Sequence, residues 1–269
     1  MHKFAAVQMC SGTDVTVNLR EAGKLMAKAA AQGAELIVLP ENFALMARDD
    51  AERVAAGEMD GSGRIQDFLA EKAENLKAWI VGGTVPVLAS RERTYARCPV
   101  YDPQGRRAAF YDKIHLFDVQ VGGAESYHES ARAEAGKKPV VVLTPFGKLG
   151  LAVCYDLRFP ELFRALIAQG ATCFAVPSAF TRTTGERHWE TLVRARAVEN
   201  LSFTVAAAQG GHHPNGRDTW GRSLLVDAWG EVVGERRDAE PGIVTGQFDP
   251  VQQQRLRGKF PVLSHRKLV

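Results

Sequence analysis

Strand-like and helix-like segments alternate along the whole chain, and this alternation constrains the fold more than any other feature. Short apolar runs such as residues 4–9, 79–84 and 172–176 are typical of buried strands. Helical patterns lie between such runs, for example at residues 17–31 and 188–200. About a dozen strands are more than one open sheet holds comfortably. The pattern therefore predicts an α/β fold in which two mixed sheets pack together and are covered by helices.

No linker of biased composition and no internal repeat divides the chain, so we expect one domain over residues 1–269. The net charge is only +3 and the basic residues are scattered, which argues against a nucleic-acid partner. No apolar run is long enough to span a membrane, and the first residues lack the apolar region of a signal peptide. We therefore expect no membrane partner and a cytoplasmic location. The four cysteines form no CxxC pair, so neither a zinc site nor a disulfide framework is expected.

One cysteine stands where an apolar strand meets a helix start. Residues 149–153 are typical of a short buried strand, while Pro160 and Glu161 suit the first turn of a helix. Cys154 is therefore expected at the carboxyl end of a strand, beside free backbone N–H groups. Such a position can lower the pKa of a thiol and can hold an oxyanion, which favours a nucleophile. A buried, inert cysteine is the alternative.

Two further charged residues follow predicted strands, at the sheet edge where α/β proteins usually assemble their sites. Glu41 follows the run 35–40, and Lys113 follows the run 107–111. Each alone has an ordinary structural explanation, a helix N-terminal carboxylate for Glu41 and a solvated loop cation for Lys113.

Glu41, Lys113 and Cys154 together make a complete chemical set for acyl transfer. Glu41 can take the thiol proton and later deliver it to a departing amine, while Lys113 stabilises the oxyanion. An ordinary carboxyl group is a poor base for an ordinary thiol. The set therefore requires a dry, enclosed pocket that raises the pKa of the carboxyl group and lowers the pKa of the thiol, so that the two values approach each other.

Three segments of the chain resemble the signature blocks of the nitrilase superfamily of carbon–nitrogen hydrolases. They are LPENFAL around Glu41, YDKIHLFD around Lys113 and GLAVCYDLRFPELFRAL around Cys154, in the family's order. The similarity covers essentially the whole chain. It implies a four-layer α-β-β-α sandwich of two mixed sheets and a Glu, Lys, Cys triad without metal or organic cofactor. It also implies a homodimer or larger homo-oligomer.

The resemblance also implies a role for each matching residue. Glu41 matches the general base, Lys113 the oxyanion-stabilising lysine and Cys154 the nucleophile. Glu129, in YHES, matches a second glutamate near the lysine and substrate, with an exposed loop acid as the alternative. The backbone N–H of Tyr155 is expected to join the oxyanion hole.

Further candidates surround these residues. Asp156 and Arg158 follow in the family's CYDxRF pattern, and we interpret both as residues that orient the loop, with a surface salt bridge as the alternative. Phe180 and Thr184 follow a predicted strand end and are candidate substrate-binding residues. Arg182 either grips a substrate carboxylate or lies in solvent, and solvent is the expectation.

Two adjacent histidines, His212 and His213, invite a metal interpretation. Neighbouring residues on a strand point in opposite directions, however, and no carboxylate partner or HExxH pattern accompanies the pair. We therefore expect no metal there, but a loop that contacts the mouth of the substrate site. Trp189 is expected to pack its helix rather than to touch a ligand.

Within the superfamily, three later segments resemble the deaminated glutathione amidases of the Nit branch. They are PSAF at 177–180, TGERHWETLVRARAVEN at 184–200 and AAAQGGHHPNGRDTWGRSLLVDAWG at 206–230. The implied activity is hydrolysis of a small carboxylated amide through a cysteine thioester, with deaminated glutathione giving 2-oxoglutarate and cysteinylglycine. One alternative is an omega-amidase acting on α-ketoglutaramate or another small amide. The other is a non-catalytic binding protein on the same scaffold.

Overall fold

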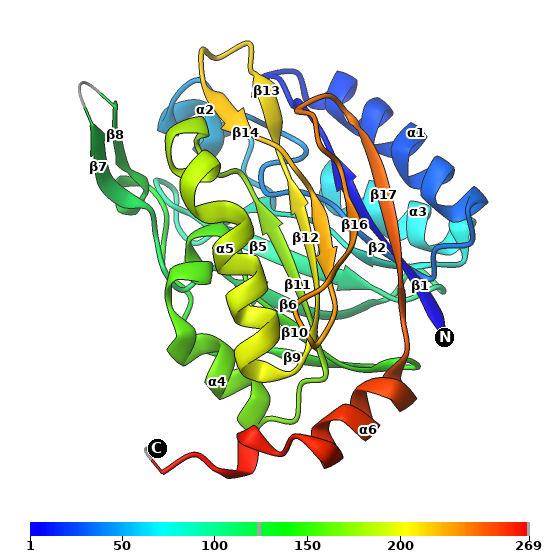
Figure 1. The fold of residues 1–269 in the computed structure, drawn as a ribbon. Coiled ribbons are helices and arrows are strands. Elements are labelled where there is room, and N and C mark those ends of the chain that lie inside the picture. The colour runs from blue at the N-terminus through cyan, green and yellow to red at the C-terminus, as the bar shows by residue number, and fades with distance from the viewer. Residues whose placement is uncertain (123–124, 268–269) are drawn as a thin grey trace.

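The structure is a computed structural model that describes residues 1–122 and 125–267. Its strands form two large sheets and two small hairpins, as Figure 1 shows. The helices are α1 (Val15–Ala31), α2 (Asp50–Ala55), α3 (Arg64–Leu76), α4 (Pro160–Ala168), α5 (Arg182–Asn200) and α6 (Pro250–Lys259). The strands are β1 (His2–Gln8), β2 (Leu36–Val38), β3 (Trp79–Val81), β4 (Val85–Leu88), β5 (Thr94–Tyr101), β6 (Arg107–Asp112), β7 (Asp118–Gly122), β8 (Glu125–His128), β9 (Val141–Thr144), β10 (Gly147–Leu151), β11 (Cys173–Ser178), β12 (Phe203–Ala208), β13 (Gly210–His212), β14 (Asp218–Trp220), β15 (Leu224–Val226), β16 (Val232–Glu235) and β17 (Gly242–Phe248).

Both large sheets are mixed. The first has the order β17-β1-β2-β3-β5-β4, with β6 paired to β5, and the second has the order β16-β15-β12-β11-β10-β9. Strands β1, β2 and β3 run parallel to one another, as do β10, β11 and β12, and the remaining pairs are antiparallel. The two mixed sheets predicted from the alternation of elements are confirmed.

Helices cover the outer face of each sheet. Leu19 and Met26 of α1 and Leu69 of α3 share one buried cluster with Val7 and Ile37 of the first sheet. Helices α4 and α5 pack on the second sheet in the same way, and Figure 1 shows the two sheets between these helix pairs. The layer order is therefore helix, sheet, sheet, helix, as the family resemblance implies.

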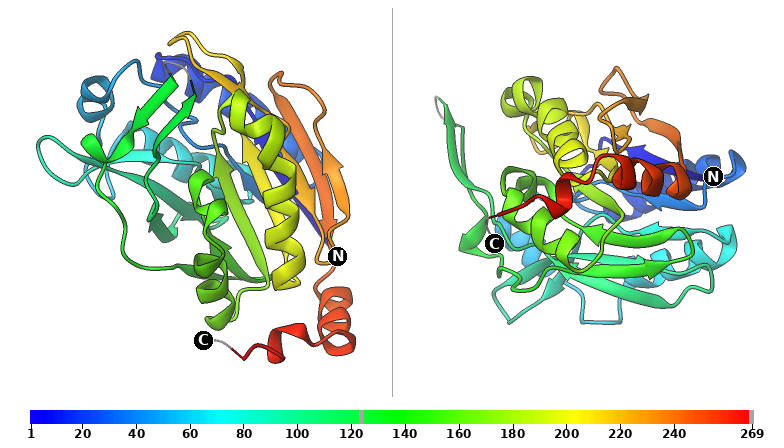
Figure 2. Two further views of the ribbon diagram at one scale, coloured as in Figure 1. Left: turned by 60° about the vertical axis from the view of Figure 1, so that its left-hand side comes forward. Right: turned by 60° about the horizontal axis from the view of Figure 1, so that its bottom comes forward.

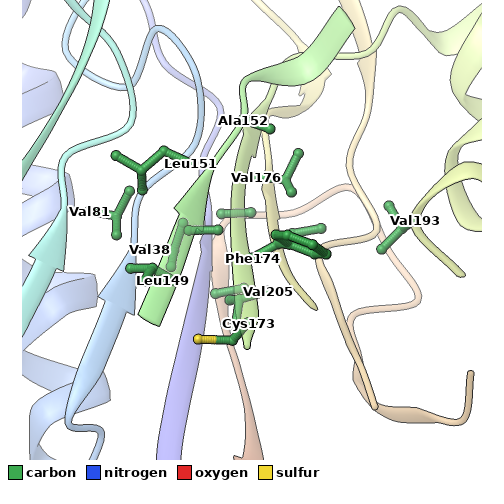
Figure 3. Close-up of a cluster of buried hydrophobic side chains, with 14 of the residues drawn as sticks. Val38, Val81, Leu149, Leu151, Ala152, Cys173, Phe174, Val176, Val193 and Val205 are labelled. Carbon is green, nitrogen blue, oxygen red and sulfur yellow. The ribbon is translucent and has the colours of Figure 1, made fainter. Parts of the chain in front are cut away.

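The central core fills the space between the sheets. Leu149 and Leu151 of β10 point toward Val38 of the first sheet, whereas Phe174 of the neighbouring strand points toward Val193 on α5 (Figure 3). Alternate residues of a strand face opposite sides of its sheet, so a strand buried on both sides is apolar throughout. This is why the run before Cys154 reads as a continuous apolar segment.

Several elements escape prediction. The hairpin β7–β8 is polar and stands away from the sandwich in Figure 1 and in the right-hand view of Figure 2. Helix α6 lies across one end of the molecule (Figure 2). Helix α5 begins at Arg182 rather than at residue 188, because the Thr181 side chain caps it by accepting from Thr184 N. In the part of the chain that the structure describes, no helix is both long and apolar enough to span a membrane.

Candidate active site

The structure brings the candidate site residues to one cavity of about 440 Å³, a volume typical of small-molecule sites. Its lining includes Glu41, Lys113, Glu129, Cys154, Tyr155, Phe180 and Thr184. Glu41 follows the carboxyl end of β2, Lys113 follows that of β6, and Cys154 follows that of β10. Residues more than a hundred positions apart in the sequence therefore meet in one cavity.

Lys113 lies at the centre of the charged groups. Its Nζ donates to Glu41 Oε1 and to Glu129 Oε2, each at 2.8 Å. Only 2% of the residue is exposed, so the explanation as a solvated loop cation is wrong. Burial alone would lower the pKa of Lys113, but the negative charges of Glu129 and Glu41 raise it above its ordinary value. The ammonium is thus a fixed positive charge inside the cavity.

Glu129 is held by two donors and is not an exposed loop acid. Besides Lys113, the backbone N–H of Phe117 donates to Glu129 Oε2 at 2.7 Å. Burial alone would raise the pKa of Glu129, but the charge and hydrogen bond of Lys113, with the Phe117 N–H, hold it below its usual range. Glu129 therefore remains ionised and fixes the position of the lysine.

Cys154 begins a 3-10 turn over Cys154–Arg158, just after β10. Its backbone φ is 48°, in the left-handed region that residues other than glycine rarely adopt. Burial and the nearby carboxylate of Glu41 raise the pKa of its thiol well above the usual value, although Lys113 and the Ala179 N–H oppose them. The expectation of a lowered thiol pKa is therefore wrong. The resting thiol therefore keeps its proton, and the carboxylate of Glu41 lies within hydrogen-bonding reach of it.

Asp156 connects the cysteine turn to the lysine segment. Its buried carboxylate accepts from Val153 N and Tyr111 Oη, each at 2.8 Å, and from His115 N at 3.2 Å. Tyr111 and His115 stand two residues to either side of Lys113. One carboxylate thus fixes the cysteine turn relative to the lysine, in agreement with an orienting role for Asp156.

Polar side chains also fix the backbone beside Glu41. Gln209 Nε2 donates to the Glu41 carbonyl oxygen at 3.1 Å, and Asn42 N donates to Thr84 Oγ1 at 2.8 Å. The explanation of Glu41 as a helix N-terminal carboxylate is wrong, because the next helix, α2, begins only at Asp50. Its carboxylate points instead at Lys113.

Arg158 differs from the sequence-based interpretation. It lines the cavity, its guanidinium lies 5.5 Å from the ring centre of Phe180, and its Nη2 lies 3.3 Å from His188 Nδ1. Among the described residues, no carboxylate lies within ion-pair distance of Arg158. Within the described part of the chain it therefore makes no surface salt bridge, and its cation faces the cavity without a carboxylate partner there.

The hairpin β13–β14 reaches the cavity through its turn. Asn215 and Arg217 line the cavity, whereas His213 is buried and His212 is exposed beside Asp218. The expectation that this loop contacts the site mouth is met by residues other than the two histidines. The run HHPNGRD offered only a weak signal for Arg217, since a basic residue in a polar turn is usually solvated.

The segment after β11 forms an apolar wall. The rings of Phe180 and the buried Trp189 lie 5.0 Å apart, and Trp189 Nε1 donates to the Arg222 carbonyl oxygen at 2.7 Å. Trp189 therefore packs its helix, as expected. The Thr184 hydroxyl lies 2.9 Å from that of Thr181, so it joins the cap of α5 as well as the cavity wall. Arg182 is exposed, as expected.

Known proteins share both the sequence and the fold. Residues 3–257 match the carbon-nitrogen hydrolase family. The deaminated glutathione amidase of Synechocystis sp. is 39% identical over 269 residues, with 98% of each chain covered. The chloroplastic omega-amidase of Arabidopsis thaliana is 34% identical, covering 97% of this chain and 71% of the relative.

Two crystal structures extend the likeness. The NitFhit protein of C. elegans superposes with a TM-score of 0.90 at 34% identity, covering 99% of this chain and 65% of that longer one. Saccharomyces cerevisiae Nit3, a member of branch 10 of the nitrilase superfamily, gives a TM-score of 0.88 at 28% identity, covering 99% and 97%. The family match over nearly the whole chain, the relatives and the shared fold lead to one conclusion: this chain belongs to the carbon–nitrogen hydrolase family of the nitrilase superfamily.

Proposed function

We propose that this hydrolase cleaves an amide through a thioester on Cys154. The observation that carries the proposal is the buried Lys113, which binds two carboxylates and interacts electrostatically with Cys154 in the same cavity. A fixed ammonium that is itself buried stabilises the negative charge that develops on a carbonyl oxygen under attack. The family match supports hydrolysis of a carbon–nitrogen bond.

The proposed chemistry uses Glu41 as the proton carrier. Glu41 accepts the thiol proton while Cys154 Sγ attacks the carbonyl carbon, and Lys113 with the Tyr155 N–H stabilises the oxyanion. The C–N bond breaks as Glu41 passes the proton to the departing amine. A water molecule, deprotonated by Glu41, then attacks the thioester and releases the acid and the thiol. Glu129 keeps Lys113 charged and in place throughout.

We propose deaminated glutathione as the substrate, which yields 2-oxoglutarate and cysteinylglycine. Relatives of that name support it, and so does the composition of the cavity wall. The acyl half of this substrate ends in a carboxylate, and Arg158 faces the cavity four residues after Cys154 with no carboxylate partner among the described residues. Phe180 and Thr184 provide the wall beside it. A guanidinium is well suited to hold a carboxylate in such a place.

An omega-amidase activity is the second candidate. α-Ketoglutaramate has the same acyl half as deaminated glutathione but loses only ammonia. The same Arg158 serves both substrates, and the relative from Arabidopsis thaliana is an omega-amidase. A non-catalytic role is disfavoured, because the complete set of Glu41, Lys113 and Cys154 faces the cavity.

A steady-state assay of 2-oxoglutarate release tests the choice. The comparison is kcat/KM for deaminated glutathione against kcat/KM for α-ketoglutaramate, because this ratio reports differential binding of the two transition states. A higher value for deaminated glutathione supports the first proposal. A higher value for α-ketoglutaramate supports the omega-amidase activity instead. No turnover of either compound contradicts both proposed activities.

We also propose a cytoplasmic homo-oligomer. All four cysteines are free, which suits a reducing compartment. Val198 on α5, Trp229 and Phe260 are exposed, and the last two rings lie 5.5 Å apart, so this end of the molecule carries an apolar patch. Light scattering after gel filtration checks it: a dimer that Trp229→Glu dissociates is expected, and a wild-type monomer would contradict it.

A further inference from the structure

Arg217 stands where the active-site cavity meets an outer hollow. A second, wider hollow of about 560 Å³ adjoins the cavity and shares three lining residues with it, Tyr127, Asn215 and Arg217. Cys154, Lys113 and Glu41 line only the inner cavity. The turn of hairpin β13–β14 therefore places Arg217 on the path from the nucleophile to the outside.

The guanidinium of Arg217 is held in place but not neutralised. Its Nε is buried without a hydrogen-bond partner, and its central carbon lies 4.8 Å from the ring centre of Tyr127. The polar contact of its Nη1 is Met46 Sδ at 4.0 Å, a weak acceptor. Within residues 1–122 and 125–267, no carboxylate lies within ion-pair distance of it. A buried donor without an acceptor is costly unless a ligand supplies one.

We propose that Arg217 binds the carboxylate at the leaving-group end of the substrate and so selects a peptide-like amide over a simple one. This inference rests on the proposed function. In deaminated glutathione the leaving group is cysteinylglycine, and its carboxylate lies about 7 Å beyond the scissile nitrogen when the two residues are extended. α-Ketoglutaramate has no group in that position.

The other cations of the cavity are engaged or placed elsewhere. Arg53 pairs with Asp50, and Arg48 pairs with Glu52. Arg158 lies against Phe180, beside the cysteine turn, where the acyl half is expected. With two cations that lack carboxylate partners, one near the nucleophile and one at the outer end, the described cavity matches a substrate with a carboxylate at each end.

The test is a cycle of two enzymes and three substrates. Wild type and Arg217→Gln are assayed by 2-oxoglutarate release on deaminated glutathione, on its C-terminal amide, and on α-ketoglutaramate. Loss of a charge-assisted pair predicts that Arg217→Gln lowers kcat/KM for deaminated glutathione by about 10–100-fold. The loss on α-ketoglutaramate is expected to be at least ten times smaller. Wild type should discriminate against the C-terminal amide, and Arg217→Gln should not.

Arg182→Gln is the matched control, because Arg182 is exposed and lines only the outer hollow. It should behave as wild type, and Arg217→Lys should recover part of the activity lost in Arg217→Gln. If Arg217→Gln loses kcat/KM equally on all three substrates, or on none of them, the proposed role of Arg217 is overturned. The proposed function then still stands, provided that wild type turns over deaminated glutathione. Failure of wild type to turn over deaminated glutathione would overturn both.

Discussion

The lysine at the inner end of the cavity and the two arginines of the cavity wall differ in how their charges are partnered. At the inner end, Lys113 binds Glu41 and Glu129. By contrast, Arg158 beside the cysteine turn and Arg217 at the outer end of the cavity have no carboxylate partner among the described residues. Buried charges persist only when they are paired, so the inner end is fully paired without a ligand, and we propose that substrate carboxylates pair with the two half-buried arginines. On the proposed function, the comparison teaches that separate groups carry the reaction and the choice of substrate.

Removal of the nucleophile tests the inner end most severely. Cys154→Ala should lower kcat by about 10⁴-fold or more on every amide, because no thioester can form. The change should leave the unfolding midpoint nearly unaltered, since it removes one sulfur atom beside an open cavity. Cys10→Ala, outside the cavity, is the control and should keep wild-type turnover. Substantial turnover by Cys154→Ala would remove Cys154 from the mechanism.

Asp156 tests whether the inner end depends on its supporting hydrogen bonds. In Asp156→Asn the new NH2 group replaces one of the two carboxylate oxygens and must face a backbone donor, either Val153 N or His115 N, so we expect a loss of about 2–4 kcal/mol in the free energy of unfolding. The same variant should lose about 10–100-fold in kcat, because the cysteine turn shifts relative to Lys113.

Asp102→Asn provides the matched comparison for Asp156→Asn. Asp102 is also buried and accepts from Gln104 N and Arg106 N, but the hairpin turn that it holds is away from the cavity, whereas Asp156 holds the turn that carries Cys154. Urea unfolding and kcat, measured on both variants, should show a stability loss in each and a kcat loss only in Asp156→Asn. If Asp156→Asn and Asp102→Asn have equal kcat values, Asp156 contributes to stability alone.

Arg158 sharpens the contrast between the two arginines. Arg158→Gln should lower kcat/KM by about 10–100-fold for both deaminated glutathione and α-ketoglutaramate, because both carry the acyl-end carboxylate. Arg217→Gln should affect the longer substrate selectively. Parallel assays on the two variants check this, and a selective loss in Arg158→Gln would exchange the two assignments.

Glu129 gives the smallest expected effect, on stability. Its folded-state pKa is depressed, so its contribution is present above its unfolded pKa of about 4.3 and is lost as the pH falls through the folded value. Glu129→Gln should therefore cost about 1–3 kcal/mol at pH 7. The difference from wild type should shrink below a pH of about 4.3.

Urea unfolding from pH 7 down to pH 3.5 measures this difference. Glu92→Gln, at an exposed position, controls for the general loss of one negative charge. A difference between wild type and Glu129→Gln that stays constant over the whole range would show that the Lys113–Glu129 pair does not depress the pKa of Glu129.

The sequence predicts the parts of the molecule that are governed by burial. The apolar runs before Glu41 and Cys154 are continuous because both faces of those strands are covered, so the strands and the charges at their ends can be located. The acidity of the Cys154 thiol could not be predicted, because it depends on burial and on Glu41, which lies far away in the chain. Arg217 was missed because a polar turn gives no pattern that separates a ligand-binding arginine from a solvated one.

The protonated state of Cys154 has a consequence for oxidative damage. Alkylating agents and peroxides attack the thiolate. A thiol whose pKa is raised contains very little thiolate at neutral pH. Iodoacetamide should therefore label Cys154 more slowly at pH 7 than it labels free cysteine. On the proposed mechanism, an amide bound beside Lys113 and Glu41 meets the same sulfur as its proton passes to Glu41, so the thiol is expected to react faster with its own substrate than with general electrophiles.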